Sequence, residues 1–356
     1  MHHTSDSVGE VVDLFCGIGG LSHGLLRSGF NVLAGYDIDA RCKFAFEKNN
    51  RAKFFARDVA KLTPHEIKAH YTGVRPSVLA GCAPCQPFSA YKRRYDEDPK
   101  WNLVKNFAQL AALVQSDFVT MENVPALVNY KNGSVFSEFC EILSNAGYYI
   151  DWSIAKCEEF SIPQKRRRLV LVASKHTAPG SLLPDGAEVK TVRQSIDGID
   201  SIKAGQTHAE DVLHASASLT KLNKSRIQAS KPGGTWRDWP EELQAACHRR
   251  SSGKTYSSVY GRMAWDAPSP TITTQCYGFG NGRFGHPEQD RAISLREAAI
   301  LQSFPFEYEF LPPGEKPSFT EVGRWIGNAV PVRLGEEIGK LIANAKTDSI
   351  HDDRSS

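Results

Sequence analysis

Short apolar runs alternate with amphipathic stretches through the first half of the chain. The apolar runs predict strands at residues 10–15, 31–36, 77–81, 118–122 and 169–174. Apolar residues at helical spacing predict helices at residues 21–28, 40–48, 103–114 and 134–145. Strands that alternate with helices form βα units, so we expect an α/β fold with a doubly wound, mainly parallel sheet.

The pattern changes after residue 174. Glycine, proline and serine are frequent from 175 to 285, and the segment KPGGTWRDWP indicates turns. Helical periodicity returns in SLREAAILQSF and again after Pro331, which is well placed to start a helix. We therefore expect a first domain at 1–174, an irregular second domain at 175–285, a C-terminal segment at 286–346 and a frayed tail at 347–356.

The composition is typical of a folded, water-soluble protein. Hydrophobic residues make up 41% and charged residues 23% of the 356 residues. No run approaches about 18 apolar residues, and the N-terminal MHHTSDSVGE lacks an apolar signal core. We expect no membrane span and take the cytoplasm as the compartment. The eight cysteines are too sparse for a disulfide scaffold and are expected to be reduced thiols.

Positive charge is concentrated in one segment of the irregular region. The net charge is only +3, but residues 221–265 contain nine Lys or Arg and three acidic residues. The same segment also holds aromatic residues, among them Trp236, Trp239, Tyr256 and Tyr260. Cations that contact phosphates and rings that pack against bases or sugars are typical of a nucleic-acid surface. A solvated basic face on an ordinary domain is the alternative.

The first predicted strand continues directly into a glycine turn, DLFCGIGG. Such a turn lets the backbone approach a ligand at the carboxyl end of the strand. Asp37 ends the second predicted strand, where a carboxylate can accept hydrogen bonds from ribose hydroxyls. The turn is G-x-G-G, not the G-x-G-x-x-G that receives a pyrophosphate, so S-adenosylmethionine is favoured over a nicotinamide dinucleotide. A tight turn without any ligand is the alternative.

Two prolines flank Cys85 in the segment GCAPCQPFS. Pro84 and Pro87 restrict the backbone around this thiol, and Cys85 does not belong to a periodic apolar face. Cys82 and Cys85 form a C-x-x-C pair, which leaves zinc binding and dithiol chemistry as alternatives. The other cysteines are scattered singly and offer no second pair for zinc, so a nucleophilic thiolate is favoured and no metal site is expected.

Charged side chains also stand at the ends of the later strands. Glu122 ends an apolar strand in MENVP, at the sheet edge where Asp37 and Cys85 are expected. A partly desolvated carboxyl group there can hold a proton near neutral pH, and capping of the next turn is the alternative. Arg166 and Arg168 alternate at the start of the last strand and are expected to point to one side, unless they form a solvated charged face.

Taken together, these segments resemble the DNA (cytosine-5) methyltransferases along nearly the whole chain. Eight motifs occur in the order of the family, namely DLFCGIGGLSHG, YDID, RDV, GCAPCQPFS, MENVP, QKRRRL, RAISLREAAILQSFP and GRWIGNAVP. The resemblance implies an S-adenosylmethionine-dependent methyltransferase fold. It also implies methyl transfer to carbon 5 of a cytosine that is first extruded from the duplex, as in other methyltransferases.

The resemblance assigns roles to individual residues. It implies that Cys85 is the nucleophile, that Glu122 lies on the pairing edge of the base, and that Arg166 and Arg168 lie near the pyrimidine oxygen. It implies an S-adenosylmethionine pocket formed by Phe15, Gly17, Ile18, Gly19, Gly20, Asp37, Ile38, Asp58, Val59, Pro84, Asn328 and Val330. The C-terminal helix is expected to return to the first domain and complete this pocket.

The resemblance also names partners and leaves alternatives open. It implies that residues 175–285 recognise double-stranded DNA, and the contact candidates are Arg237, Arg249, Arg250 and Arg283, each of which could instead bind only phosphate. The short chain resembles a bacterial or phage modification enzyme, active as a monomer and paired in function with a restriction endonuclease. A close relative in the family methylates transfer RNA and carries a Cys-Phe-Thr signature. This chain lacks the tripeptide, so an RNA cytosine-5 methyltransferase is disfavoured. A DNA-binding regulator without catalysis and a nicotinamide oxidoreductase are the remaining alternatives.

Overall fold

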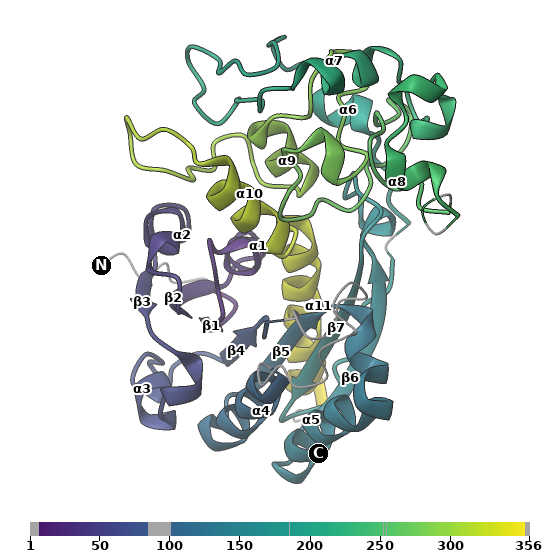
Figure 1. The fold of residues 1–356 in the computed structure, drawn as a ribbon. Coiled ribbons are helices and arrows are strands. Elements are labelled where there is room, and N and C mark those ends of the chain that lie inside the picture. Colours follow the sequence, from purple (N-terminus) through teal and green to yellow (C-terminus); the bar gives the residue numbers. More distant parts are fainter. Residues whose placement is uncertain (1–6, 85–100, 185, 252, 254, 353–356) are drawn as a thin grey trace. The chain divides into compact units, whose positions relative to one another are not determined.

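The chain forms two compact units (Figure 1). The computed structural model describes residues 7–84, 101–184, 186–251, 253 and 255–352. Unit 1 comprises Met1–Phe160, Arg167–Gly186 and Val330–Ser356, and unit 2 comprises Ser161–Arg166 and Ala187–Ala329. Residues 286–329 therefore group with the irregular segment, whereas the sequence indicates that they return to the first domain.

A seven-stranded sheet with the order β3-β2-β1-β4-β5-β7-β6 lies at the centre of the described part of unit 1. The strands are β1 (Glu10–Leu14), β2 (Asn31–Asp37), β3 (Lys53–Ala56), β4 (Ser77–Gly81), β5 (Phe118–Asn123), β6 (Tyr149–Lys156) and β7 (Arg167–Ser174). β7 runs antiparallel to β5 and β6, and the other neighbouring pairs are parallel. The predicted α/β fold with a mainly parallel sheet is confirmed.

The two strands that the apolar runs did not reveal are the outer strands of the sheet. β3 has only four residues, and both of its ends are exposed. Only Ala155 of β6 is fully buried, and the other positions of this strand are partly buried or exposed. β6 has a neighbouring strand on one side only. An outer strand buries less apolar surface than a central one, so its sequence carries a weaker signal.

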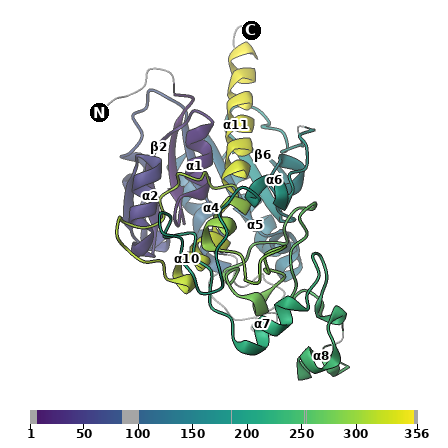
Figure 2. The ribbon, with the colours of Figure 1, turned by 90° about the horizontal axis from the view of Figure 1, so that it is seen from above.

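Helices cover the sheet of unit 1. They are α1 (Gly20–Arg27), α2 (Lys43–Asn50), α3 (Pro64–Lys68), α4 (Asn102–Val114), α5 (Ser134–Asn145) and α11 (Val332–Asp352). α11 packs along α1, and Figures 1 and 2 show it as the long C-terminal helix. Its helical backbone continues to Asp352, beyond position 346, where the sequence indicates a frayed end.

Small residues allow α1 and α11 to approach closely. A Cβ atom at Gly24 would lie 2.3 Å from the carbonyl oxygen of Val332, and one at Gly335 would lie 2.9 Å from the carbonyl oxygen of Leu21. Both distances are too short for a real side chain. The glycines therefore fix the packing of the C-terminal helix against the first helix, the one that follows the glycine turn.

Unit 2 contains short helices joined by irregular segments. The helices are α6 (Val192–Ile196), α7 (Lys221–Gln228), α8 (Ala246–Arg249), α9 (Leu295–Leu301) and α10 (Phe319–Asn328). Trp236 and Trp239 are each only 4% exposed and form a small core with Phe279. The expectation that these two indoles pack against nucleic acid is wrong, because the local core of the unit buries them.

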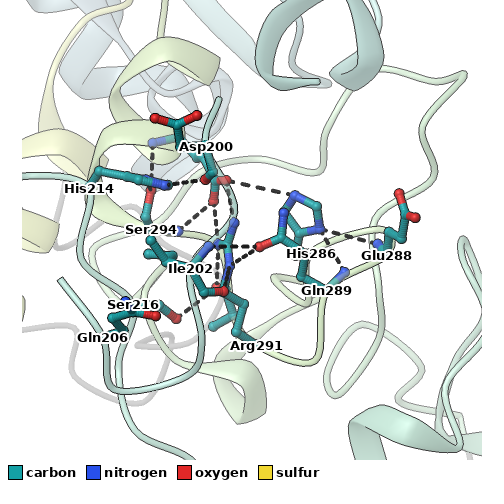
Figure 3. A network of polar contacts seen from close by, with 12 residues as sticks. Asp200, Ile202, Gln206, His214, Ser216, His286, Glu288, Gln289, Arg291 and Ser294 are labelled. Carbon is teal, nitrogen blue, oxygen red and sulfur yellow. Dashed lines mark hydrogen bonds and ion pairs between the residues drawn. The ribbon is translucent and has the colours of Figure 1, made fainter. Parts of the chain in front are cut away.

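A buried polar network holds the start of α9 in unit 2 (Figure 3). Arg291 is fully buried and donates to both carboxylate oxygens of Glu297, at 2.7 Å each. Glu297 also accepts the backbone N–H of Ser294, which caps the helix in return. His286 lies 3.7 Å from Glu297, and burial lowers the pKa of its imidazole to about 4. This part of unit 2 is therefore a rigid polar core.

Candidate functional site

The carboxyl ends of four neighbouring strands bring the candidate residues of unit 1 to one edge. β2, β1, β4 and β5 are adjacent and parallel, so their carboxyl ends meet at the same side of the sheet. Asp37 ends β2, the glycine turn follows β1, Pro84 lies in the loop after β4, and Glu122 belongs to the end of β5. In open α/β sheets, ligands bind outside the carboxyl ends of the strands. Cys85 itself lies outside the described residues.

The glycine turn leaves room for a ligand at its backbone. Phe15, Gly17 and Gly19 have φ values of 57°, 51° and 89°, in the left-handed region that favours glycine. A Cβ atom at Gly17 would meet no atom of the described structure within 4 Å, whereas one at Gly19 would lie 2.3 Å from the side-chain nitrogen of Asn50. The lack of a side chain at Gly19 thus permits the turn to pack on α2. The backbone of Gly17 has free space beside it, which a bound cofactor could occupy.

Asp37 is held rigidly beside this turn. Its carboxylate accepts the backbone N–H of Gly17 at 2.9 Å and that of Asp39 at 2.8 Å. The next side chain, Ile38, is 77% exposed. An exposed apolar residue next to a fixed carboxylate fits a nucleoside, whose ribose requires hydrogen bonds and whose base requires apolar cover.

The other predicted cofactor residues differ in their surroundings. Ile18 and Val59 are buried, so their side chains belong to the core of unit 1, and Phe15 packs edge-on against Phe107 at 6.5 Å between ring centroids. Asp58 accepts the N–H of Ala60 at 3.0 Å. Gly20 begins α1. Asn328 ends α10 in unit 2, and Val330 belongs to unit 1.

A buried carboxyl group lies on β1, just before the turn. Asp13 is 1% exposed, and its Oδ2 accepts the hydroxyl of Ser22 at 2.6 Å. Its Oδ1 is buried and has no hydrogen-bond partner among the described residues. Burial raises the pKa of Asp13 to about 7, and the Asp37 carboxylate adds to this rise. Asp13 is not among the site residues predicted from the sequence, although a carboxylate within the apolar run VVDLF could have indicated it.

Glu122 and Arg168 form an ion pair at the end of β5. Oε1 of Glu122 lies 2.8 Å from Nε of Arg168, although the two atoms lack the alignment of a hydrogen bond. Both side chains are largely buried. Cys82 lies next to this pair, and burial followed by the Glu122 charge raises the pKa of its thiol well above the usual value. Cys82 is therefore a neutral thiol at physiological pH.

Asn123 connects β5 with the loop that leads to Cys85. Its side-chain nitrogen donates to the carbonyl oxygen of Ala83 at 3.1 Å, and its side-chain oxygen accepts the backbone N–H of Val124 at 2.9 Å. Asn123 is buried, so this hydrogen bond is shielded from water. The residue before Pro84 is thereby fixed to the strand that carries Glu122, a link that the sequence did not reveal.

Arg166 and Arg168 belong to different units. Arg168 lies in β7 of unit 1, whereas Arg166 is buried in unit 2. The guanidinium group of Arg166 donates to the carbonyl oxygens of Ile272 at 2.9 Å and Gly327 at 3.1 Å. Arg166 thus has structural partners in its own unit, and a contact with the pyrimidine stays a prediction.

Three of the four basic candidates in unit 2 are exposed to solvent. Arg237, Arg249 and Arg250 are exposed, and Arg283 is partly buried. The guanidinium carbon of Arg237 lies 5.6 Å from the ring centroid of Trp236, a cation–π contact. Within the described ranges, no group of three His, Cys, Asp or Glu residues is placed to hold a metal ion. Across the same ranges, no helix is long and apolar enough to cross a membrane.

The sheet order and the cradle at the glycine turn together define a methyltransferase of the α/β class. The sequence model of the family described as C-5 cytosine-specific DNA methylase matches residues 9–344. The chain belongs to this family, and it is an enzyme that methylates carbon 5 of cytosine in DNA.

Similar proteins cover almost the whole chain. The type II methylase M.HgiDII of Herpetosiphon aurantiacus is 49% identical over 94% of this chain and 95% of its own length. The type II methyltransferase M.Eco47II of Escherichia coli is 31% identical over 96% of this chain and 80% of its own length. A solved structure of a proposed DNA modification methyltransferase from an E. coli prophage has a TM-score of 0.74 at 23% identity, covering 95% of this chain and 99% of that one. That structure supports the fold alone.

Proposed function

We propose that Cys85 is the nucleophile of the methyl transfer and that Glu122 and Arg168 act on the same cytosine. The observation that carries this proposal is the Glu122–Arg168 ion pair at the end of β5, next to a loop that Asn123 fixes just before Pro84 and Cys85. A carboxylate, a guanidinium group and a thiol on adjacent strand ends can act together on one small ring.

The proposed chemistry follows from the electronic structure of cytosine. Carbon 5 is a poor nucleophile, so the Cys85 thiolate first adds to carbon 6 and shifts electron density toward carbon 5. Glu122 shares a proton with N3 and thereby neutralises the charge that builds on the ring, and Arg168 holds the carboxyl group in place. Once carbon 5 carries the transferred methyl group, its proton is lost to a base, the bond between carbon 6 and sulfur breaks, and departure of the thiolate restores the aromatic ring.

We propose S-adenosylmethionine as the methyl donor, and the residues of unit 1 fit it. When bound, the cofactor supplies an electrophilic methyl group. The open backbone at Gly17, the fixed carboxylate of Asp37 and the exposed Ile38 would hold its nucleoside, as described above. The buried Oδ1 of Asp13, unpaired among the described residues, provides a further acceptor at the same edge.

We also propose that unit 2 recognises the DNA sequence and that the enzyme protects DNA in a restriction-modification system. The exposed arginines of the basic segment, among them Arg237, Arg249 and Arg250, support a phosphate-binding surface. The relatives are named type II methylases and come from bacteria, which supports a restriction endonuclease as functional partner and the bacterial cytoplasm as compartment. A monomer suffices, because one active site modifies one strand at a time.

The test combines product analysis with covalent trapping. Double-stranded DNA and labelled S-adenosylmethionine should give 5-methylcytosine, and DNA that contains 5-fluorocytosine should form an adduct that survives denaturation. Cys85→Ser should lose both products while it still binds the cofactor. Cys140→Ser is the matched control, because Cys140 lies on helix α5 and not in a loop that follows a strand, and it should retain both. An adduct formed by Cys85→Ser would overturn the assignment, and equal labelling of RNA would redirect it to an RNA substrate.

A further inference from the structure

The order of the strands places Asp13 between the neighbours of β1, near the side of the sheet where the proposed cofactor binds. β1 lies between β2, which ends in Asp37, and β4, which leads to Pro84. If Asp37 holds the ribose and the methyl group is delivered beside Cys85, the methionyl part of S-adenosylmethionine must pass the end of β1. That part carries a sulfonium and an α-ammonium group, so it is the cationic end of the molecule.

Among the residues that the structure describes, no cation acts on the pKa of Asp13. Ser22 on α1 donates to Oδ2, and the titratable groups that influence Asp13, or that its charge influences, are the carboxylate of Asp37 on β2 and the thiols of Cys16 and Cys82. Each of these groups is neutral or negative. Burial therefore favours the protonated carboxyl group as long as no positive charge enters the site.

We propose that Asp13 is the counter-charge for the cationic end of the cofactor, and that cofactor binding drives the proton off this carboxyl group into solution. The proposal rests on the proposed cofactor. The orphaned Oδ1 is the acceptor that the bound cation completes, and the fixed Oδ2 keeps the carboxylate in place through Ser22.

The inference predicts a pH-dependent affinity. The pKa of Asp13 in the free protein is raised to about 7, so below this pH the proton must leave before the cation can bind. The dissociation constant of S-adenosylmethionine should therefore fall about tenfold between pH 6 and pH 8. Isothermal titration calorimetry in buffers of different ionisation enthalpy should show release of about half a proton at pH 7.

Asp13→Asn and Ser22→Ala separate this linkage from other causes. Asp13→Asn keeps an acceptor for Ser22, and its dissociation constant should vary with pH only as the titration of the cofactor itself dictates. Its unfolding transition at pH 8 should not fall below that of the wild type, because a buried carboxylate is removed. Ser22→Ala removes a hydrogen bond that lowers the pKa of Asp13, so the midpoint of the affinity profile should move to higher pH.

Comparison of ligands identifies the cation involved. S-adenosylhomocysteine keeps the ammonium group and lacks the sulfonium charge, so a profile that persists with it assigns the linkage to the ammonium group, and one that disappears assigns it to the sulfonium. Equal pH profiles for the wild type and Asp13→Asn, or a lack of proton release, would overturn the inference and leave the proposed function intact. A lack of S-adenosylmethionine binding at every pH would overturn the proposed cofactor instead.

Discussion

The carboxyl group of Glu122 is both buried and paired with a cation. The ion pair with Arg168 fixes the position of this carboxyl group, and the residue is only 6% exposed. A neutral thiol, Cys82, occupies the adjacent position after β4 and adds no competing negative charge. The side chain is thus oriented by its neighbours before any substrate arrives, which is the condition for electrostatic stabilisation of a transition state.

Glu122→Gln tests this role directly. The amide keeps the size of the side chain but cannot supply a proton, so kcat should fall by roughly 10²- to 10⁴-fold. Single-turnover methylation measures this loss, and cofactor affinity should stay unchanged. Glu138→Gln is the matched control, since Glu138 forms a half-exposed pair with Lys105 on the helices of unit 1. Wild-type kcat in Glu122→Gln would contradict the proposed proton sharing.

The sequence could predict the site residues that stand at the ends of strands. Asp37 and Glu122 lie at the carboxyl ends of predicted strands, and ligands of open α/β sheets bind outside these ends. Other residues could not be predicted because their partners are distant in sequence or buried. Asn123 bonds to the carbonyl oxygen of Ala83, and Asp13 accepts a hydrogen bond from the buried Ser22. Periodicity assigns such residues to a buried strand and carries no information about an unpaired oxygen or an anchored loop.

At the scale of elements, the contact between α1 and α11 depends on the absence of a side chain. Gly24→Ala would place a Cβ atom 2.3 Å from the Val332 carbonyl and force the two helices apart. Urea denaturation should show a loss of about 1–3 kcal/mol in the free energy of unfolding. Gly198→Ala is the control, since its Cβ would meet nothing within 4 Å of the described structure, and it should change stability little. Equal effects of the two substitutions would contradict this packing.

The polar network at α9 predicts acid sensitivity. The pKa of His286 is lowered to about 4 in the folded chain, so the unfolded chain binds more protons between about pH 6.5 and pH 4. Stability from the neutral imidazole is thus present above this window and lost as pH falls through it. The free energy of unfolding, measured in urea at pH 7, 5.5 and 4.5, should fall less steeply in His286→Gln. Parallel profiles would contradict the buried neutral state.

Elements with strong local signals were predictable, and weakly buried ones were not. The glycine turn, the central strands and α9 with its Ser294–Glu297 capping box follow from local sequence. β3 and β6 were missed because outer strands carry little apolar surface. The burial of Trp236 and Trp239 was missed for the opposite reason, since an aromatic ring suits a small core as well as a base.

At the scale of the whole molecule, the charge distribution predicts how salt affects DNA binding. Replacing Arg237, Arg249 and Arg250 by Gln should weaken binding at all sequences and reduce the slope of log affinity against log salt by about 0.9 per lost phosphate contact. Fluorescence anisotropy between low and high salt measures this slope. Arg193→Gln is the control, because Arg193 already pairs with Asp266, and its slope should remain unchanged. An unchanged slope in the triple variant would place the phosphate contacts elsewhere.

The path of the chain through the two units limits how new specificities can arise. Residues 187–329 form one continuous insert, but Ser161–Arg166 belongs to the same unit and comes from an earlier part of the chain. A recombination event that replaces residues 187–329 with the corresponding segment of another enzyme would leave residues 161–166 of the original chain in place. The incoming segment must then present backbone carbonyls like those of Ile272 and Gly327 to a foreign Arg166. Functional chimeras should therefore arise between parents that both place these two carbonyl oxygens around Arg166, whatever DNA sequences the parents recognise.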